Sequence, residues 1–181
     1  RLGLLGDQPR LAEVLQRAAR LGGWDGGRAG SGQGIALARM DAFGDEARTG
    51  GGRIACVAKA RMGEGGLMVE QLTAVVDIGR IVNLDIARQQ IEGGLLFGLG
   101  LAAGSSVQWE GGRPAPDRLG GLALPTLASA PDVVVEFIGS DALPFDPGEL
   151  GAAVAPPAIA NALFAATGLR FRALPLVAGA A

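Results

Sequence analysis

The chain has 181 residues, nearly half of them apolar, and a formal net charge of −2 at pH 7. This length and composition indicate one globular domain, or a piece of one, and the near-neutral charge gives no electrostatic reason to expect a nucleic acid or an anionic membrane as partner. The sequence has no histidine and one cysteine, which excludes a histidine-based triad, an internal disulfide framework and a four-cysteine iron–sulfur site within it.

Hydrophobic periodicity and turn residues predict intermixed helices and strands. Apolar residues at helical spacing indicate the helices, β-branched runs indicate the strands, and glycine pairs or triplets separate them. The expected elements are a helix over 9–21, strands over 35–40, 54–61 and 68–78, a helix over 84–103, strands over 107–110 and 132–138, a helix over 158–166 and a short strand over 169–174. This irregular order predicts an α+β fold with antiparallel strands and packed helices. No apolar run reaches the roughly twenty residues that a membrane span requires.

Several polar or small residues have local structural interpretations. Asn83 directly precedes a predicted helix and is interpreted as its N-cap. Asp77 is interpreted as a turn residue at a strand end, and Cys56 as a buried, inert thiol. The Gly32-Gln33-Gly34 motif precedes a strand, whereas a dinucleotide-binding fingerprint follows one and opens a helix.

The predicted helix over 84–103 contains glycines at 93, 94, 98 and 100. Each weakens a helix by about 1 kcal/mol relative to alanine, and a helix tolerates this where something must approach its backbone closely. That group is either a neighbouring element or a ligand. The sequence favours neither.

Glu149 lies in a loop over 144–151 that glycines and prolines frame. Its sequence neighbours are almost entirely apolar, so we expect a rigid, buried turn. Desolvation of this kind suits a carboxylate to proton transfer. The alternative is a surface turn that contains a glutamate. Pro156-Pro157 predict the start of the following helix, in which Asn161 is expected to reach back to the loop.

Two blocks of sequence resemble a known family. The C-terminal block comprises Gly148-Glu149, Ala155-Pro156-Pro157, residues 160–168 and residues 172–176, and the other comprises residues 74–83, 90–94 and 97–100. In order and spacing they resemble the C-terminal end of the large, molybdenum-binding subunit of the xanthine oxidase/aldehyde oxidoreductase family, in particular its isoquinoline 1-oxidoreductase beta-subunit branch. The resemblance divides the chain into a helix and glycine-rich connection over 1–31, a molybdopterin-binding domain fragment over 32–177 and a tail over 178–181. It implies that a longer stretch of the same subunit precedes the chain.

The resemblance also implies a reaction and a set of site residues. Glu149 would be the base in the hydroxylation of an aldehyde or N-heteroaromatic carbon with oxygen from water. Gln90, Gly93, Gly94 and Gly148 would contact molybdopterin cytosine dinucleotide, although Gln90 equally suits a solvent-facing helix position. A small partner subunit would carry [2Fe–2S] clusters, and the fragment alone would be inactive.

The chain departs from the family pattern in two places. Asp146-Pro147 stands where family loops have glycine two residues before the glutamate, which stiffens the loop and adds a negative charge. The segment over 113–131 lacks the aromatic residues of the resembled branch. A diverged, non-catalytic binding or assembly module that keeps the fold is therefore the alternative function.

Overall fold

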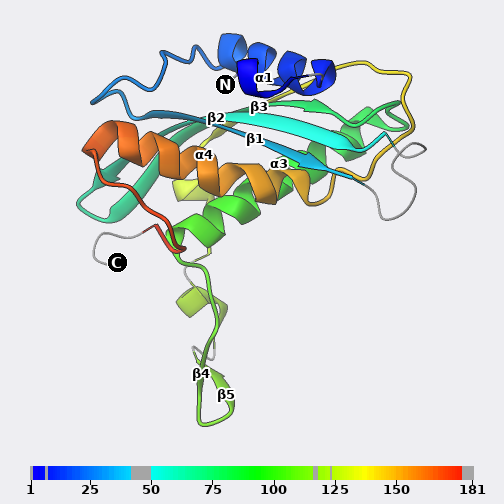
Figure 1. The fold of residues 1–181 in the computed structure, drawn as a ribbon. Helices are drawn as coiled ribbons and strands as arrows, with labels where there is room; N and C mark the ends of the chain where they lie inside the picture. The colour runs from blue at the N-terminus through cyan, green and yellow to red at the C-terminus, as the bar shows by residue number, and fades with distance from the viewer. Residues whose placement is uncertain (1, 7, 42–49, 116–117, 123, 177–181) are drawn as a thin grey trace.

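The computed structural model describes residues 2–6, 8–41, 50–115, 118–122 and 124–176. In these residues a four-stranded sheet lies between helix α1 on one face and helices α3 and α4 on the other (Figure 1). The helices are α1 (Pro9–Leu21), α3 (Leu84–Ala103) and α4 (Leu150–Thr167), with 3-10 turns at Leu2–Leu4, Leu119–Leu122 and Leu127–Ser129. The strands are β1 (Gln33–Met40), β2 (Gly52–Gly63), β3 (Gly66–Asp77), β4 (Gln108–Glu110), β5 (Arg113–Ala115) and β6 (Asp132–Phe137). The predicted α+β fold is confirmed.

The strand order in the main sheet is β1-β2-β3-β6. The first three strands form the predicted antiparallel meander, in which Cys56 on β2 lies opposite Ala36 on β1 and Ala74 on β3. Strand β6 pairs with β3 in parallel, which the sequence did not indicate. A parallel pair needs a long crossover, and here α3 and the segment after it provide this connection.

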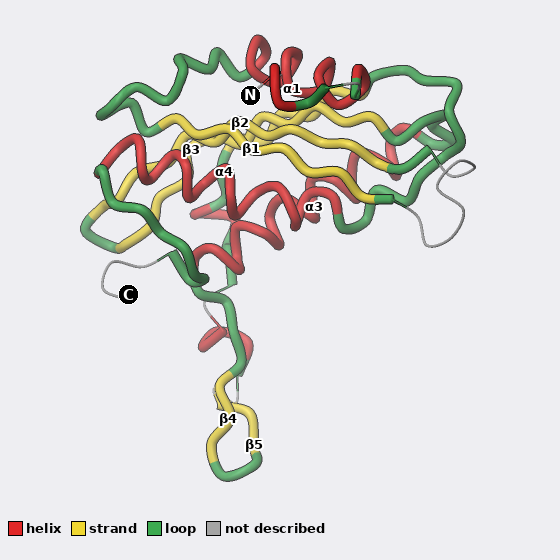
Figure 2. Tube along the Cα trace, viewed as in Figure 1, coloured by secondary structure: helices red, strands yellow, loops and turns green. Residues whose placement is uncertain are grey.

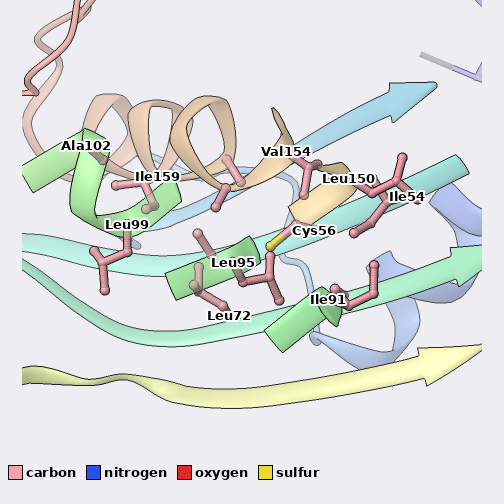
Figure 3. Close-up of a cluster of buried hydrophobic side chains, with 14 of the residues drawn as sticks. Ile54, Cys56, Leu72, Ile91, Leu95, Leu99, Ala102, Leu150, Val154 and Ile159 are labelled. Atoms are coloured by element: carbon pink, nitrogen blue, oxygen red, sulfur yellow. The ribbon is translucent and has the colours of Figure 1, made fainter. Parts of the chain in front are cut away.

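Both faces of the sheet are covered. On β2, Ile54, Cys56 and Ala58 point into the core shared with α3 and α4, whereas Ala55 and Val57 point into the core under α1. Figure 3 shows the first of these cores, where sheet residues meet side chains from both helices. The alternation over 54–61 is typical of a half-buried strand, but both faces of β2 are buried, because α1 covers the face that a two-layer fold would leave open.

Helix α4 begins at Leu150 rather than at Ala158, so Pro156 and Pro157 lie inside it. Prolines interrupt helical hydrogen bonding and crowd the preceding turn, which is why the sequence predicted a helix start there. Gly98 on α3 leaves room for the pyrrolidine ring of Pro156, because a Cβ at Gly98 would lie 3.1 Å from Pro156 Cδ. The strand predicted over 169–174 is also wrong, since this stretch is irregular.

Strands β4 and β5 form a hairpin at the end of an arm that projects away from the three layers (Figures 1 and 2). Strand β5 lies between the strands predicted over 107–110 and 132–138, where the sequence indicated no element. Its three residues are too few to show the alternation of a strand. We call residues 105–131, as far as they are described, the arm. Several of its large apolar residues are exposed, among them Trp109, Leu119 and Leu127.

Helix α4 alone, among the described helices, is long and apolar enough to cross a membrane by composition. Just over half of it is buried in the fold, where it packs against β1, β2 and α3. Burial of this kind is typical of a core helix.

The local interpretations of Asn83, Asp77 and Cys56 are confirmed. Asn83 Oδ1 accepts a hydrogen bond of 3.0 Å from the amide of Ile86 and caps α3. Asp77 Oδ1 accepts one of 3.1 Å from the amide of Gly79, and Cys56 is fully buried. The tail over 178–181 lies outside the described residues.

Candidate active site

All five predicted site residues line one cavity. This cavity of about 500 Å³ lies where α3 passes the start of α4, and we call it the glutamate hollow. Its lining comprises Ile86, Gln89, Gln90, Gly93, Gly94 and Phe97 on α3, with Gly148, Glu149 and Ala152 at the start of α4. The fold thus brings together residues that are about sixty positions apart in the sequence, while their chemical roles remain predictions.

The loop before α4 holds Glu149 at the edge of the hollow. Asp146 Oδ1 accepts a hydrogen bond of 2.9 Å from the amide of Gly148, and Pro147 O accepts one of 3.2 Å from the amide of Leu150. Asp146 and Pro147, which were expected to stiffen the loop, therefore accept the hydrogen bonds that close the turn. Glu149 is the N-cap residue of α4, but its carboxylate makes no capping hydrogen bond and lines the hollow instead.

Glu149 is exposed in this structure, so its predicted burial is wrong for the described chain. The apolar neighbours that prompted the prediction turn inward; Leu150, the next residue, is fully buried. The helix starts at the border of the helical layer, where its N-cap residue Glu149 faces outward and its first residue, Leu150, enters the core. A run of apolar neighbours does not reveal which residue faces outward.

The glycines of α3 have different roles. A Cβ at Gly98 would lie 2.9 Å from the Cβ of Ala155, and one at Gly94 would lie 3.2 Å from the Cα of Gly151. These two glycines let α3 and α4 approach each other. A Cβ at Gly93 would meet nothing within 4 Å, so Gly93 leaves open space in the hollow. The interpretation as close packing of a neighbouring element is therefore confirmed at Gly94 and Gly98, whereas a ligand contact at Gly93 stays a prediction.

Gln90 is exposed on α3 and lies beside the loop that carries Glu149. Its Oε1 is 3.6 Å from the position that a Cβ on Gly148 would take. The amide can both donate and accept hydrogen bonds. It is therefore placed to contact a molecule in the hollow.

A second cavity, which the sequence did not predict, adjoins the hollow. It has a volume of about 610 Å³ and lies between α3 and the arm, and we call it the apolar cavity. Gly93 and Phe97 line both cavities. The apolar composition of residues 119–127 was the available signal, but only the fold shows that this segment faces α3.

Asn161 does not reach the loop of Glu149, contrary to the prediction. Its Nδ2 donates a hydrogen bond of 3.0 Å to Ile35 O on β1, and its Oδ1 accepts one of 2.9 Å from Arg170 Nη1. The reason is that α4 begins eight residues earlier than expected, which moves Asn161 three turns along the helix from the loop. Its role is to join α4 to the sheet.

The hollow suits an anionic organic cofactor that makes hydrogen bonds. The first turn of α4 borders it at Ala152, and helix N-termini favour negative groups because their amides point outward. Gly93 leaves room, and Gln90 offers an amide. Among the described residues, no group of three or more His, Cys, Asp or Glu side chains is arranged so that it could hold a metal ion.

A model of the molybdopterin cofactor-binding domain family matches residues 32–131, more than half of the chain. The chain belongs to this family, and it is a molybdopterin-binding subunit, or part of one, of the xanthine oxidase family. The resemblance inferred from the two sequence blocks is thereby confirmed.

Individual relatives agree with this assignment. The chain is 34% identical over 67% of its length to a membrane-bound aldehyde dehydrogenase (pyrroloquinoline-quinone) of Gluconacetobacter polyoxogenes, of which it covers 16%. It is 29% identical over 97% of its length to the isoquinoline 1-oxidoreductase subunit beta of Brevundimonas diminuta, of which it covers 22%. The aldehyde oxidoreductase of Desulfovibrio gigas superposes on 70% of the chain with a TM-score of 0.57 and 25% identity, and the chain covers 14% of it. The chain thus spans less than a quarter of the length of each of these three proteins.

Proposed function

We propose that the chain is the C-terminal part of the molybdopterin-binding subunit of a molybdenum hydroxylase. The enzyme would oxidise an aldehyde or an N-heteroaromatic carbon with an oxygen atom from water. The observation that carries this proposal is the single hollow that gathers a carboxylate, a carboxamide and an open glycine from α3 and the start of α4. Family membership and relatives named as aldehyde and isoquinoline oxidoreductases support the same reaction class.

The residues of the hollow would divide between base and cofactor contacts. Glu149 would accept, on a carboxylate oxygen, the proton that the water-derived oxygen loses as it bonds to the substrate carbon. Gln90 would hydrogen-bond the cofactor, Gly93 and Gly148 would let it approach the backbone, and Gly94 would line the hollow beside them. When bound, molybdopterin cytosine dinucleotide would supply the two-electron oxidation.

Other parts of the enzyme would complete the reaction. The rest of the same subunit would enclose the hollow, and a small subunit with [2Fe–2S] clusters would take the electrons onward. The chain alone is therefore expected not to turn over substrate. Its exposed Glu149 agrees with this division, because a carboxylate that must be desolvated would need a cover that the described residues do not provide.

The first test compares the complete subunit, co-expressed with its iron–sulfur partner, with its Glu149→Gln variant. We expect molybdenum in both proteins and substrate-dependent dye reduction lowered at least about a hundredfold in the variant, since general bases contribute factors of this size. Glu64→Gln, an exposed glutamate in the β2–β3 turn outside the hollow, is the matched control. It should retain full activity.

Two outcomes would contradict the proposal. Absence of molybdenum from well-folded wild-type protein would favour the non-catalytic binding or assembly module. Equal activity of the wild type and the Glu149→Gln variant would keep the enzyme class but remove the base from Glu149.

The cofactor contact is tested separately. Gln90→Leu should lower the pterin and molybdenum content of the purified protein, because it removes a hydrogen-bonding amide from the hollow. Gln108→Leu, on exposed β4, is the control and should leave the content unchanged. Equal pterin and molybdenum content in the wild type and both variants would mean that Gln90 is a solvent-facing helix residue that does not contact the cofactor.

A further inference from the structure

We propose that the ion pair between Arg10 and Asp77 positions the loop that carries Glu149, although the pair lies under α1 and the glutamate hollow is formed by α3 and α4. Arg10 and Asp77 are positioning residues, because neither of them lines the hollow. The inference rests on the proposed function, since the place of Glu149 matters for turnover if this carboxylate is the base. It goes further by assigning a catalytic consequence to a contact outside the site.

The ion pair fixes the backbone at the end of β3. The buried carboxylate of Asp77 accepts hydrogen bonds of 2.6 Å from Nε and Nη2 of Arg10 and one of 3.1 Å from the amide of Gly79. Gly79 has a φ of +73°, in the left-handed region that glycine adopts without a steric penalty. One side chain therefore joins α1 to the turn over 77–80 and holds the shape of that turn.

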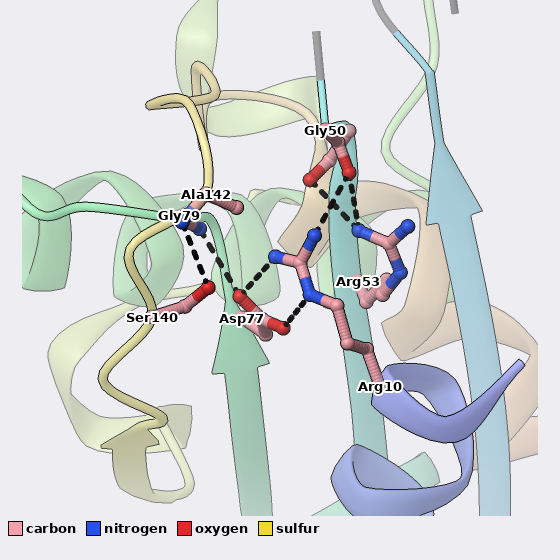
Figure 4. A network of polar contacts seen from close by, with 8 residues as sticks. Arg10, Gly50, Arg53, Asp77, Gly79, Ser140 and Ala142 are labelled. Atoms are coloured by element: carbon pink, nitrogen blue, oxygen red, sulfur yellow. Dashed lines mark hydrogen bonds and ion pairs between the residues drawn. The ribbon is translucent and has the colours of Figure 1, made fainter. Parts of the chain in front are cut away.

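The turn over 77–80 supports the start of the loop that carries Glu149. Figure 4 shows Ala142 of the loop beside Gly79 of the turn. Two hydrogen bonds of 2.9 Å, one in each direction, join the segments: Arg80 N to Ala142 O, and Phe145 N to Ile78 O. A Cβ at Gly79 would lie 2.2 Å from the carbonyl oxygen of Leu143, so the two main chains are in direct contact. The start of the loop must therefore follow any movement of the turn.

Arg10 also holds a second segment that touches the loop. Its Nη1 donates a hydrogen bond of 3.2 Å to Gly50 O, and a Cβ at Gly50 would lie 3.4 Å from Leu143 O. A Cβ at Gly52 would lie 2.5 Å from Cδ1 of Phe145. The start of the loop is thus seated against two main-chain segments that one guanidinium group connects.

Glu149 lies between two fixed points. Phe145 is bound to the β3 turn, and Leu150, which directly follows Glu149, is fully buried. Between them, the hydrogen bond from the amide of Gly148 to Asp146 Oδ1 closes the chain into a turn. A displacement at Phe145 would therefore be passed on to Glu149. Misplacement of a catalytic group by about 1 Å can cost about a hundredfold in rate.

The first experiment measures kcat and KM of the holoenzyme, which is the complete subunit with its iron–sulfur partner. Asp77→Ala removes the ion pair and the acceptor of the Gly79 amide. It should lower kcat per bound molybdenum at least about tenfold and leave KM and molybdenum content within about twofold of the wild type. Asp77→Asn keeps an oxygen that can accept the Gly79 amide and should recover part of the loss. If Asp77→Ala does not fold, the kcat loss of Asp77→Asn carries the test.

Val14→Ala is the matched control. Val14 is fully buried under α1, so this substitution also loosens the packing of α1 but leaves Arg10 and Asp77 in place. It should retain the wild-type kcat per bound molybdenum. Equal losses of kcat in Val14→Ala and Asp77→Ala would overturn the inference, because both would then reflect a general loosening of α1.

A double-mutant cycle tests whether the ion pair acts through Glu149. In the Glu149→Gln background, Asp77→Ala should lower the residual kcat by less than about twofold, because the carboxylate that the pair positions is already absent. Losses that multiply in the double variant would show that Asp77 acts independently of Glu149 and would overturn the inference.

Amide hydrogen exchange gives a readout that does not need turnover. In the complete subunit, a peptide over 142–149 should exchange at least about tenfold faster in Asp77→Ala than in the wild type or in Val14→Ala. If exchange responds in this way but none of the proteins oxidises a substrate, the proposed function fails and the structural link stands. If Glu149→Gln lowers turnover but Asp77→Ala leaves kcat unchanged, the proposed function stands and the inference fails.

Discussion

Arg10 donates two hydrogen bonds of 2.6 Å, from Nε and Nη2, to the two carboxylate oxygens of Asp77 (Figure 4). The pair joins α1 to the end of β3 across 67 positions of sequence. Asp77 also accepts the amide of Gly79, and Arg53 lies alongside with its own hydrogen bonds to the Gly50 and Gly51 carbonyls. This network fixes α1 on the sheet face that the other helices leave open.

Removal of one partner of this pair should destabilise the fold. Asp77 is 3% exposed and Arg10 is 30% exposed, and truncating one member of a buried pair leaves the other charge uncompensated. We expect Arg10→Ala to lower the free energy of unfolding by about 3 kcal/mol, measured by urea denaturation. Arg17→Ala, which removes a partly exposed arginine of the same helix, should cost less than about 1 kcal/mol because its ion pairs lie at the surface. Equal effects would contradict the role of the buried carboxylate.

The stability conferred by Asp77 should depend on pH. Burial would raise the pKa of Asp77, but hydrogen bonds from Arg10 and Gly79 and the charges of Arg10 and Arg53 outweigh it, so that the pKa lies below its ordinary value. A lowered folded-state pKa adds stability above the unfolded value of about 3.9 and loses it as the pH falls through the folded value. The melting temperatures of wild type and Asp77→Asn should therefore differ at neutral pH and converge below about pH 4. A constant difference over this range would show that ionisation of Asp77 is irrelevant.

Two glycines of α3 should respond oppositely to alanine. Gly93→Ala meets open space and should stabilise the protein by about 0.5–1 kcal/mol, because glycine is a poor helix former. Gly98→Ala would place a methyl group 2.9 Å from the Cβ of Ala155, and we expect a loss of about 1–3 kcal/mol. Chemical denaturation of both variants under identical conditions provides the comparison. Similar effects of the two substitutions would mean that α3 does not approach α4 as closely as described.

The thiol of Cys56 should be inert in the folded protein. Burial raises its pKa to about 12, so it has almost no reactive thiolate at neutral pH. A thiol reagent at pH 8 should label Cys56 only after addition of denaturant. Labelling of the native protein at a rate typical of exposed cysteines would indicate frequent opening between β1, β2 and β3.

The sequence predicted the elements with strong periodicity and missed those determined by contacts across the chain. The meander, α3 and the cap at Asn83 follow from local patterns. The five predicted site residues line one hollow, and their chemical roles stay predictions. The start of α4 was misplaced because Pro156 is accommodated by a glycine 58 positions earlier, which no local rule detects. The exposure of Glu149 and the pairing of Arg10 with Asp77 were missed for the same reason.

The start of α4 is positioned by backbone contacts. A Cβ at Gly151 would lie 2.7 Å from the Ile91 carbonyl oxygen, and one at Gly34 on β1 would overlap the backbone near Ala158 and Asn161. A helix seated directly on neighbouring main chains cannot shift by the small steps that a change of side-chain size allows. The position of Glu149, directly before Leu150, is thus fixed by main-chain packing. Changes of side-chain size around the start of α4 would leave this position unchanged. The arm projects away from these main-chain contacts (Figure 1), so its sequence can change without moving the loop that carries Glu149.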